Sequence, residues 1–531
     1  MNTVTKDAMN LVPALVVVCM TLIAGAGHAS PWQEPVKEYE LSCGRQGGQL
    51  TLATTSDPKS FNPIAAKEAT TSAITGYIFE GLTRTDPVTM EVEPLLARSW
   101  EVDETGTVWT FNLRDDVRFN DGARFTADDV VFTFNELIYN PEIPNSSQDI
   151  FTIDGKRIEV EKVDTHTVRF RLPAPFAPFL RSLGQEILPR HKYRAQVEDN
   201  SFNYSMGLDT PLSGIVGTGP FMLAEYVPGE RIILERNRYY WQKDECGVSL
   251  PYLDRVLYVV LPSPDTSLLK FLDGEIDYFS MRAEDISFLG PQQEKRGFTI
   301  YNGGVAFGSQ FLALNQNPGT DAAGKSYLPP YKREWFSNAI FRKALSYAIQ
   351  REKIIEIVMN GLGEPQHGPM SPGAGYFYNK DLLPYPYDPG KACDLLASLD
   401  FHDRNGDGVR EDKDGNRLTI SFFTIAKSPE SLLIASMVRK DLQRIGVEVQ
   451  FLPLSFNHLV TKLTSTFDWE MILIGLTGGI EPHFGKNVWA SNGALHMWHP
   501  FQETPATDWE KRIDEIFNEA AQTIDETERK K

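Results

Sequence analysis

The residues best suited to hold an ion lie in one acidic segment, residues 403–414. Oxygen-bearing side chains stand at its first, third and fifth positions, a glycine at the sixth and a carboxylate at the twelfth: Asp403, Asn405, Asp407, Gly408 and Asp414. Ca²⁺ prefers oxygen ligands at this spacing around a sharp turn, and Glu411 could add another. Asp414 is shorter than the usual closing Glu. The segment predicts a structural calcium loop, and the alternative is an acidic surface turn between a helix and a strand.

Other residue types give weaker indications of chemistry. His483, His496 and His499 have no compact metal-ligand spacing and no cysteine nearby, so we interpret them as scattered side chains at a cleft edge. The sequence contains no G-x-S-x-G elbow, H-E-x-x-H helix or phosphate-binding glycine loop. We therefore do not expect the protein to be an enzyme, and we do not expect it to require a cofactor. A secreted hydrolase with a carboxylate pair is the alternative from another class.

The first residues indicate export. An apolar run over residues 11–26 ends in Gly27-His28-Ala29, which predicts a secretory signal over residues 1–29. Val18 precedes Cys19 where a lipoprotein signal has a small residue, so lipidation is not expected. The net charge of −19 argues against a nucleic-acid partner. We expect a periplasmic or secreted protein after cleavage.

The remaining sequence predicts alternating strands and helices. Residues 108–114 alternate apolar and polar side chains, as in a strand with one buried face. A turn at Asn120-Asp121-Gly122 follows, and Thr126 with Asp129 forms the capping box of a helix. Further helices are predicted near residues 341–349, 389–399 and 430–445, and a strand over 447–452.

This region also carries a family resemblance. An ordered series of residues between positions 94 and 137 resembles the large substrate-binding proteins of bacterial ABC importers, the extracellular solute-binding family 5 of peptide and nickel carriers. The series comprises Ala97, Ser99-Trp100, Thr110-Phe111, Leu113-Arg114, Val117, Phe119, Asp121-Gly122, Thr126-Ala127 and Asp129-Val130. The resemblance implies an α/β fold of the two-lobed periplasmic-binding-protein type, type II-like and of the large cluster, with an extra domain inserted in lobe one.

The resemblance also implies a domain organisation. Residues 30–95 and 201–303 would form lobe one, 96–200 the inserted domain, 304–495 lobe two, and 496–531 a truncated return to lobe one. The chain would cross between the lobes near residues 303–310 and 492–500. Cys43 and Cys246 flank strands that the family places in one domain, so we expect them to pair and leave Cys393 as a buried thiol.

The implied function is capture of a peptide or peptide-like solute between two lobes and its delivery to an ABC permease, by a monomer. The alternative ligand is a non-peptide solute, an oligosaccharide or a metal chelate. Expected ligand-binding residues are Phe61, Asn62, Tyr376 and Tyr378, with Phe377 and Trp489 as further aromatic walls.

One segment departs from the family's peptide binders. They carry an Asp that pairs with the peptide's α-ammonium, whereas this chain has Gly478, Gly479 and then Glu481-Pro482 there. Glu481 could replace the Asp. The other interpretation is a ligand without a free ammonium, which approaches the backbone at the two glycines. The segment could also be a tight turn near the hinge.

Overall fold

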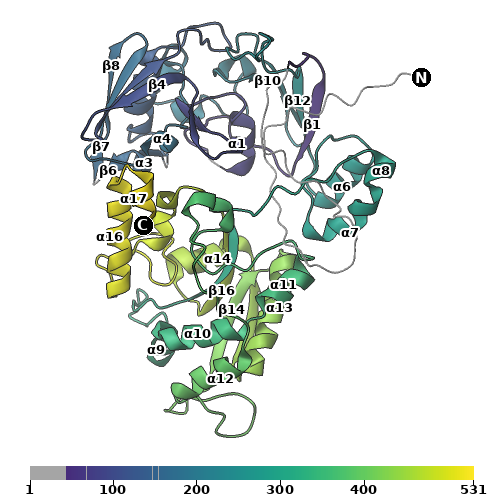
Figure 1. The fold of residues 1–531 in the computed structure, drawn as a ribbon, viewed down its shortest axis with the longest axis vertical. Helices are drawn as coiled ribbons and strands as arrows, with labels where there is room; N and C mark the ends of the chain where they lie inside the picture. The colour runs from purple at the N-terminus through teal and green to yellow at the C-terminus, as the bar shows by residue number, and fades with distance from the viewer. Residues whose placement is uncertain (1–42, 67, 146, 154) are drawn as a thin grey trace. The chain divides into compact units, whose positions relative to one another are not determined.

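The computed structural model describes residues 43–66, 68–145, 147–153 and 155–531, so the expected signal over 1–29 lies outside the described residues. The chain divides into two compact units (Figure 1). The described part of unit 1 comprises residues 43–281 and 521–531, and unit 2 comprises 282–520. The boundaries between the two units fall at 281/282 and 520/521. The sequence instead predicts that the chain crosses between the lobes near residues 303–310 and 492–500. The second boundary lies inside helix α16 (Asp508–Gln522).

The main sheet of unit 1 has the order β1-β12-β11-β10. Its strands are β1 (Gln49–Thr54), β12 (Arg255–Val260), β11 (Arg231–Arg236) and β10 (Phe221–Val227). β1 and β12 pair in parallel, and the other pairs are antiparallel. Gly229, with φ of +70°, makes the expected turn between β10 and β11. Alternate apolar residues of these strands, Leu223, Ile232, Leu234 and Val256, are buried in one core.

Unit 1 also contains a second, antiparallel sheet, of order β4-β5-β9-β8. It consists of β4 (Ala97–Val102), β5 (Val108–Leu113), β9 (Thr167–Arg171) and β8 (Glu159–Asp164). The alternation in β5 buries Trp109, Phe111 and Leu113. Phe111 packs edge-on against Phe170 of β9, with ring centroids 5.5 Å apart. This sheet has a hydrophobic core of its own, distinct from that of the main sheet.

Helix α2 (Ala127–Phe132) begins as the sequence predicts. The Thr126 hydroxyl accepts from Asp128 N at 3.3 Å, and the Asp129 carboxylate accepts from Thr126 N at 2.9 Å, which confirms the capping box. A π-helical segment, η2 (Thr133–Ile138), follows directly. Asp129 also accepts from Arg190 N at 2.9 Å, so this carboxylate fixes two segments of unit 1.

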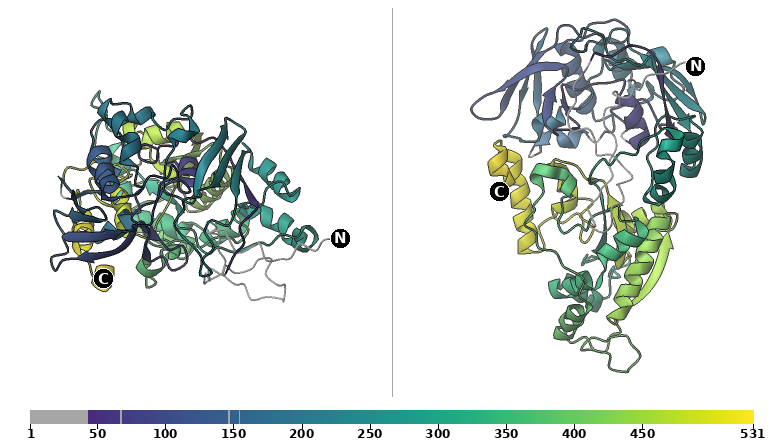
Figure 2. Two further views of the ribbon diagram at one scale, coloured as in Figure 1. Left: turned by 90° about the horizontal axis from the view of Figure 1, so that it is seen from above. Right: turned by 45° about the vertical axis from the view of Figure 1, so that its right-hand side comes forward.

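Unit 2 is built on a sheet of order β13-β16-β14-β15. Its strands are β13 (Ser309–Leu314), β16 (Met471–Leu476), β14 (Thr419–Ile425) and β15 (Glu448–Leu454). β14 is parallel to both neighbours, whereas β13 is antiparallel to β16. In Figure 2 the strands β14, β15 and β16 of this sheet carry the light-green to yellow-green colours, with helices packed along them.

Both faces of this sheet are covered. Phe422 and Leu473 point into a core shared with α10 (Ala339–Ala348), α12 (Pro389–Ser398) and α13 (Pro429–Arg444). Their neighbours Phe423 and Ile474 point to the other face, where α14 (Phe456–Thr461) contributes Leu459. Helices on both faces of a largely parallel sheet define an α/β fold, so the expected fold class is confirmed.

Further helices connect these elements. They are α1 (Ala69–Thr75), α5 (Arg190–Glu198), α6 (Pro264–Leu272), α9 (Pro330–Ser337), α11 (Arg351–Val358) and α17 (Glu526–Lys530). Among the helices within the described ranges, none is long and apolar enough to cross a membrane.

A disulfide joins Cys43 to Cys246, as expected, with their Cα atoms 5.5 Å apart. It ties the start of the described chain to a loop before β12. The Asp244 carboxylate supports the same loop, because it accepts from Gly44 N at 3.1 Å and from the Tyr252 hydroxyl at 2.7 Å. Cys393 is a free thiol, but it is partly exposed and not buried, because its position on α12 lies at the rim of the unit 2 core.

Candidate functional site

The carboxyl edge of the unit 2 sheet is our candidate ligand site. β14, β15 and β16 run in parallel and end at this edge, and α13 and α14 begin there on opposite faces of the sheet. Ser428 caps α13 through its side chain, which accepts from Ser431 N at 3.2 Å, and Ser455 caps α14. Open α/β sheets bind ligands outside the carboxyl ends of the strands, where consecutive helices go to opposite faces.

The two glycines that follow β16 have different surroundings. A Cβ on Gly478 would lie 1.9 Å from the carbonyl oxygen of Phe307, so this glycine is required by the chain's own backbone. A Cβ on Gly479 would meet nothing within 4 Å. We expected a ligand to approach the backbone closely at these two glycines. At Gly478 the backbone of residue 307 takes that place, and of the two glycines only Gly479 faces open space.

The segment before Phe307 is held by two further contacts. A Cβ on Gly373 would lie 2.4 Å from the carbonyl oxygen of Val305, and the Ser371 hydroxyl donates to the carbonyl oxygen of Ala306 at 2.5 Å. Residues 305–307 thus lie between the glycine after β16 and the start of the 3₁₀ segment η7 (Pro372–Phe377). Sequence analysis missed this arrangement, because a single sequence does not indicate which distant backbone segment will lie against a given glycine.

Glu481 lies in the same segment but is turned toward its own backbone. Its Oε1 accepts from His483 N at 2.9 Å and caps the 3₁₀ turn η9 (Pro482–Gly485). The residue is 4% exposed. One carboxylate oxygen therefore has a structural role, of the kind that Glu and Asp commonly take before a helical turn. Its role toward a ligand ammonium stays a prediction.

The expected aromatic residues of unit 2 fall in two places. Tyr376 is 46% exposed at the end of η7 and packs against Phe377 with ring centroids 5.2 Å apart; Tyr378 follows and is half-buried. Trp489 belongs to a different cluster, with its ring 6.0 Å from that of Trp498. Contact of these rings with a ligand stays a prediction.

Phe61 and Asn62, the expected residues of unit 1, are almost fully buried, at 1% and 0% exposure. Phe61 packs edge-on against Tyr226 with ring centroids 5.6 Å apart. The Asn62 side-chain oxygen accepts from Ile64 N at 3.0 Å and Ala65 N at 3.3 Å. Its Nδ2 is buried and has no partner within the described part of the chain. Both residues thus stabilise unit 1, and their contact with a ligand stays a prediction.

A buried carboxylate network that the sequence did not reveal surrounds Glu510. Glu510 is 2% exposed and accepts hydrogen bonds from Trp498, Gln502 and Thr507, at 2.7–3.1 Å, and faces His496 Nε2 at 3.2 Å. Burial alone would raise the pKa of Glu510, but the hydrogen bonds from these partners lower it to about 2. His496 is fully buried, so it does not lie at a cleft edge as we expected.

The acidic segment 403–414 forms a tight loop in which backbone amides use most of the side-chain oxygens. Asp403 accepts from Gly406 N at 2.7 Å and Gly408 N at 2.9 Å, and Asp407 accepts from Val409 N at 2.9 Å and pairs with Arg417. Across the described ranges, no group of three or more His, Cys, Asp or Glu side chains is arranged to hold a metal ion. Calcium binding by this loop stays a prediction.

Comparison with known proteins supplies the family. The family model of the bacterial extracellular solute-binding proteins, family 5 Middle, matches residues 91–494. A probable ABC transporter-binding protein of Deinococcus radiodurans is 27% identical over 521 residues, covering 91% of this chain and 84% of that protein. The oligopeptide-binding protein AppA of Bacillus subtilis is 28% identical over 485 residues, covering 88% and 80%.

A solved structure agrees with these sequence relatives. The structure of AppA from Bacillus subtilis in complex with a nonapeptide aligns with a TM-score of 0.66 at 25% identity, covering 92% of this chain and 89% of that one. The α/β architecture described above and the length of these matches lead to one conclusion. The chain belongs to the bacterial extracellular solute-binding proteins, family 5, and has the two-lobed periplasmic-binding-protein fold.

Proposed function

We propose that this solute-binding protein captures a peptide or peptide-like molecule and delivers it to an ABC permease. The observation that carries the ligand class is the similarity to the oligopeptide-binding relative, which extends over 88% of this chain. The carboxyl edge of the unit 2 sheet supports a binding role, because α13 and α14 leave that edge on opposite faces and Gly479 faces open space.

In this proposal, the segment after β16 provides no carboxylate that serves only to bind the α-ammonium of the ligand. A buried ammonium requires an opposite charge, because its desolvation otherwise costs several kcal/mol. The nearest carboxylate in the segment is Glu481, and its Oε1 is engaged by His483 N. We therefore expect a peptide-like ligand whose amino end is blocked or is bound by other groups.

The test is identification of the bound solute followed by matched binding measurements. Native mass spectrometry of the purified chain identifies what is carried, and thermal unfolding then compares that peptide in its free and N-acetylated forms. If the amino end is blocked, the N-acetylated form should raise the melting temperature at least as much as the free form. If other groups bind the amino end, the larger rise of the free form should persist in Glu481→Gln. A much larger rise with the free amine, abolished in Glu481→Gln, would assign the ammonium to Glu481 and overturn the second part of the proposal.

The same measurements test the binding role itself. A binding protein returns its ligand unchanged, whereas a hydrolase releases product. Incubation of the peptide with the chain at equal concentrations, followed by mass spectrometry of the peptide, should recover it intact. Reproducible cleavage, retained after repurification, would show an enzyme and contradict the proposed function.

We further propose that the mature protein is periplasmic or secreted and acts as a monomer. Removal of the signal after Ala29 would leave a chain that begins at Ser30. N-terminal sequencing of the exported protein checks the cleavage, and light scattering coupled to gel filtration checks the mass. A mass of two chains at micromolar concentration would contradict the monomer.

A further inference from the structure

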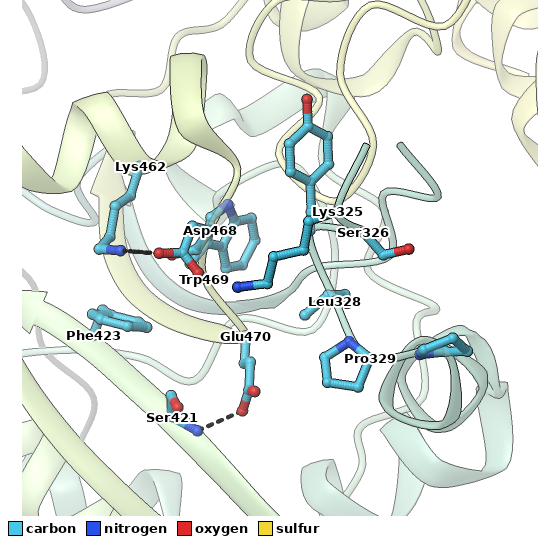
Figure 3. Close-up of a pocket in the computed structure, with 12 residues that line it drawn as sticks. Lys325, Ser326, Leu328, Pro329, Ser421, Phe423, Lys462, Asp468, Trp469 and Glu470 are labelled. Carbon is cyan, nitrogen blue, oxygen red and sulfur yellow. Dashed lines mark hydrogen bonds and ion pairs between the residues drawn. The ribbon is translucent and has the colours of Figure 1, made fainter. Parts of the chain in front are cut away.

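A pocket lies in unit 2, away from the carboxyl edge of its sheet. It has a volume of about 400 Å³ and is lined by residues 325–330, Ser421, Phe423, Lys462 and residues 468–470 (Figure 3). Ser421 and Phe423 lie in the middle of β14 and residues 468–470 precede β16, whereas the glycine segment follows the end of β16. Six strand residues span roughly 17–20 Å. We call this cavity the outer pocket.

Apolar side chains form much of the wall of the outer pocket. Phe423 and Trp469 line it on the side of the sheet, and Leu328, Pro329 and Pro330 line it on the side of the chain that leads into α9. Trp469 is 2% exposed and Phe423 is 7% exposed, so both rings are fixed by packing and offer only a small part of their surface to the cavity. A cavity of this size with a lining that is partly apolar and partly charged can hold a small organic molecule.

Two of the cations around the pocket are already neutralised. The Lys462 ammonium donates to the Asp468 carbonyl oxygen at 2.7 Å and to its carboxylate at 3.1 Å. Lys332, behind the wall, donates to both carboxylate oxygens of Glu470, at 2.8 and 2.9 Å. Ser421 N donates to the same carboxylate at 2.7 Å. Neither carboxylate of the wall therefore offers a free negative charge to a ligand.

Lys325 carries the one lining charge that has no counter-ion in the described part of the chain. Figure 3 shows its side chain extending into the space bounded by Trp469, Leu328 and Glu470. The lining thus presents an uncompensated ammonium beside apolar surface. Such a site favours a molecule with one negative charge and an apolar body, because the charge pairs with the ammonium while the body displaces water from the walls.

We propose that the outer pocket binds a small organic monoanion, such as a carboxylate or sulfonate carried on an aromatic or branched aliphatic group. The acidic group pairs with Lys325, and the apolar body contacts Trp469, Phe423 and Leu328. This site is separate from the one that the proposed function uses, so each can fail without the other. Because Lys325 is exposed to solvent, we expect weak binding, with a Kd on the order of 1 mM.

The test uses phenylacetate as the probe and its neutral amide, phenylacetamide, as the matched control ligand. Binding to the full exported chain is followed by saturation-transfer NMR and by the change in tryptophan fluorescence. Phenylacetate should bind measurably, and phenylacetamide about fivefold more weakly. Lys325→Gln should weaken phenylacetate about fivefold, and Lys325→Glu should abolish its binding.

The protein control is Lys380→Gln, which removes another exposed lysine of unit 2 that has no described partner. It should leave phenylacetate binding unchanged. Equal affinity of the wild-type chain and Lys325→Gln would overturn the proposal, as would the absence of binding at about 20 mM probe. The Lys325 backbone bonds to Asp321, but its side chain bonds to no described residue, so its substitution should not affect folding. Circular dichroism of each variant verifies this.

Discussion

The carbonyl oxygen of Phe307 occupies the place where a side chain on residue 478 would begin, since a Cβ there would lie 1.9 Å from that oxygen. Two segments distant in sequence, the one before β13 and the one after β16, can therefore meet only if residue 478 is glycine. β13 and β16 pair along their whole length, from Ser309 opposite Leu476 to Leu314 opposite Met471, so neither segment can move away without breaking that register.

Gly478→Ala should therefore destabilise the protein. The methyl group must displace the residue 307 backbone, and overpacking of this kind typically costs about 1–3 kcal/mol. Gly479→Ala is the matched control, because its Cβ would meet no atom within 4 Å. Urea unfolding of both variants measures the difference. Equal stability of the two variants would show that the residue 307 segment yields without cost.

Stability should depend on pH through Glu80. This carboxyl group is 6% exposed, accepts from the Tyr240 hydroxyl at 3.1 Å and Trp241 Nε1 at 3.4 Å, and burial raises its pKa to about 7. In the unfolded chain its pKa is near 4.5. Between these values the unfolded form ionises before the folded form, so the free energy of unfolding should fall as pH rises, by at most about 3 kcal/mol.

Glu80→Gln should remove this decrease, because the amide does not ionise. Thermal unfolding of the variant and the wild type from pH 4.5 to 8 measures the difference curve, in which the other titrating groups cancel. Glu91→Gln, an exposed glutamate of the same unit, is the control and should leave the wild-type curve unchanged. A wild-type curve that runs parallel to that of Glu80→Gln would contradict the assignment.

Glu510 should have the opposite pH dependence. Its ionised form is favoured in the folded state, since hydrogen bonds lower its pKa to about 2. Its contribution is therefore present above about pH 4.5 and is lost as pH falls toward 2. Glu510→Gln should cost about 2–3 kcal/mol at pH 7, because the amide places a donor among donors.

The cost of Glu510→Gln should shrink on acidification, and chemical denaturation at pH 7 and pH 3 tests this. Glu503→Gln, an exposed neighbour, should have little effect at either pH. If Glu510→Gln were as stable as the wild type at pH 7, the network around this carboxylate would contribute nothing.

Calcium binding at residues 403–414 should depend on Arg417. This guanidinium pairs with Asp407 and, at 2.9 Å, with Glu448, so an ion in the loop must compete with it. Ca²⁺ should raise the melting temperature of the wild type, with a gain of about 3 kcal/mol at a hundredfold excess over Kd. Arg417→Gln should tighten binding and Asp407→Asn should abolish it, as measured by titration calorimetry. Mg²⁺ is the control ion, and an absence of heat with Ca²⁺ would refute the loop as a site.

The sequence predicted the elements of the fold better than the contacts of the candidate site. The capping box of Thr126 and Asp129 depends on residues three apart, so a local pattern was enough to identify it. The role of Gly478 depends on residue 307, and that of Glu510 on residues that only the folded chain brings around it. Glu481 is a further example. The sequence identified its carboxylate as a candidate, but it did not show that this carboxylate points toward His483 N.

β14 pairs on both sides and is buried on both faces, with Phe422 in one core and its neighbour Phe423 in the other. At these two positions, apolar character therefore cannot tell one face of the strand from the other. A slip of one residue would exchange two phenylalanines without exposing either ring. The register of β14 is fixed by polar contacts within the strand: Ser421 N donates to the Glu470 carboxylate at 2.7 Å, and the Thr424 hydroxyl donates to the Leu473 carbonyl oxygen at 3.2 Å. The register of β14 therefore depends on the polar contacts beside the two rings and not on the rings themselves.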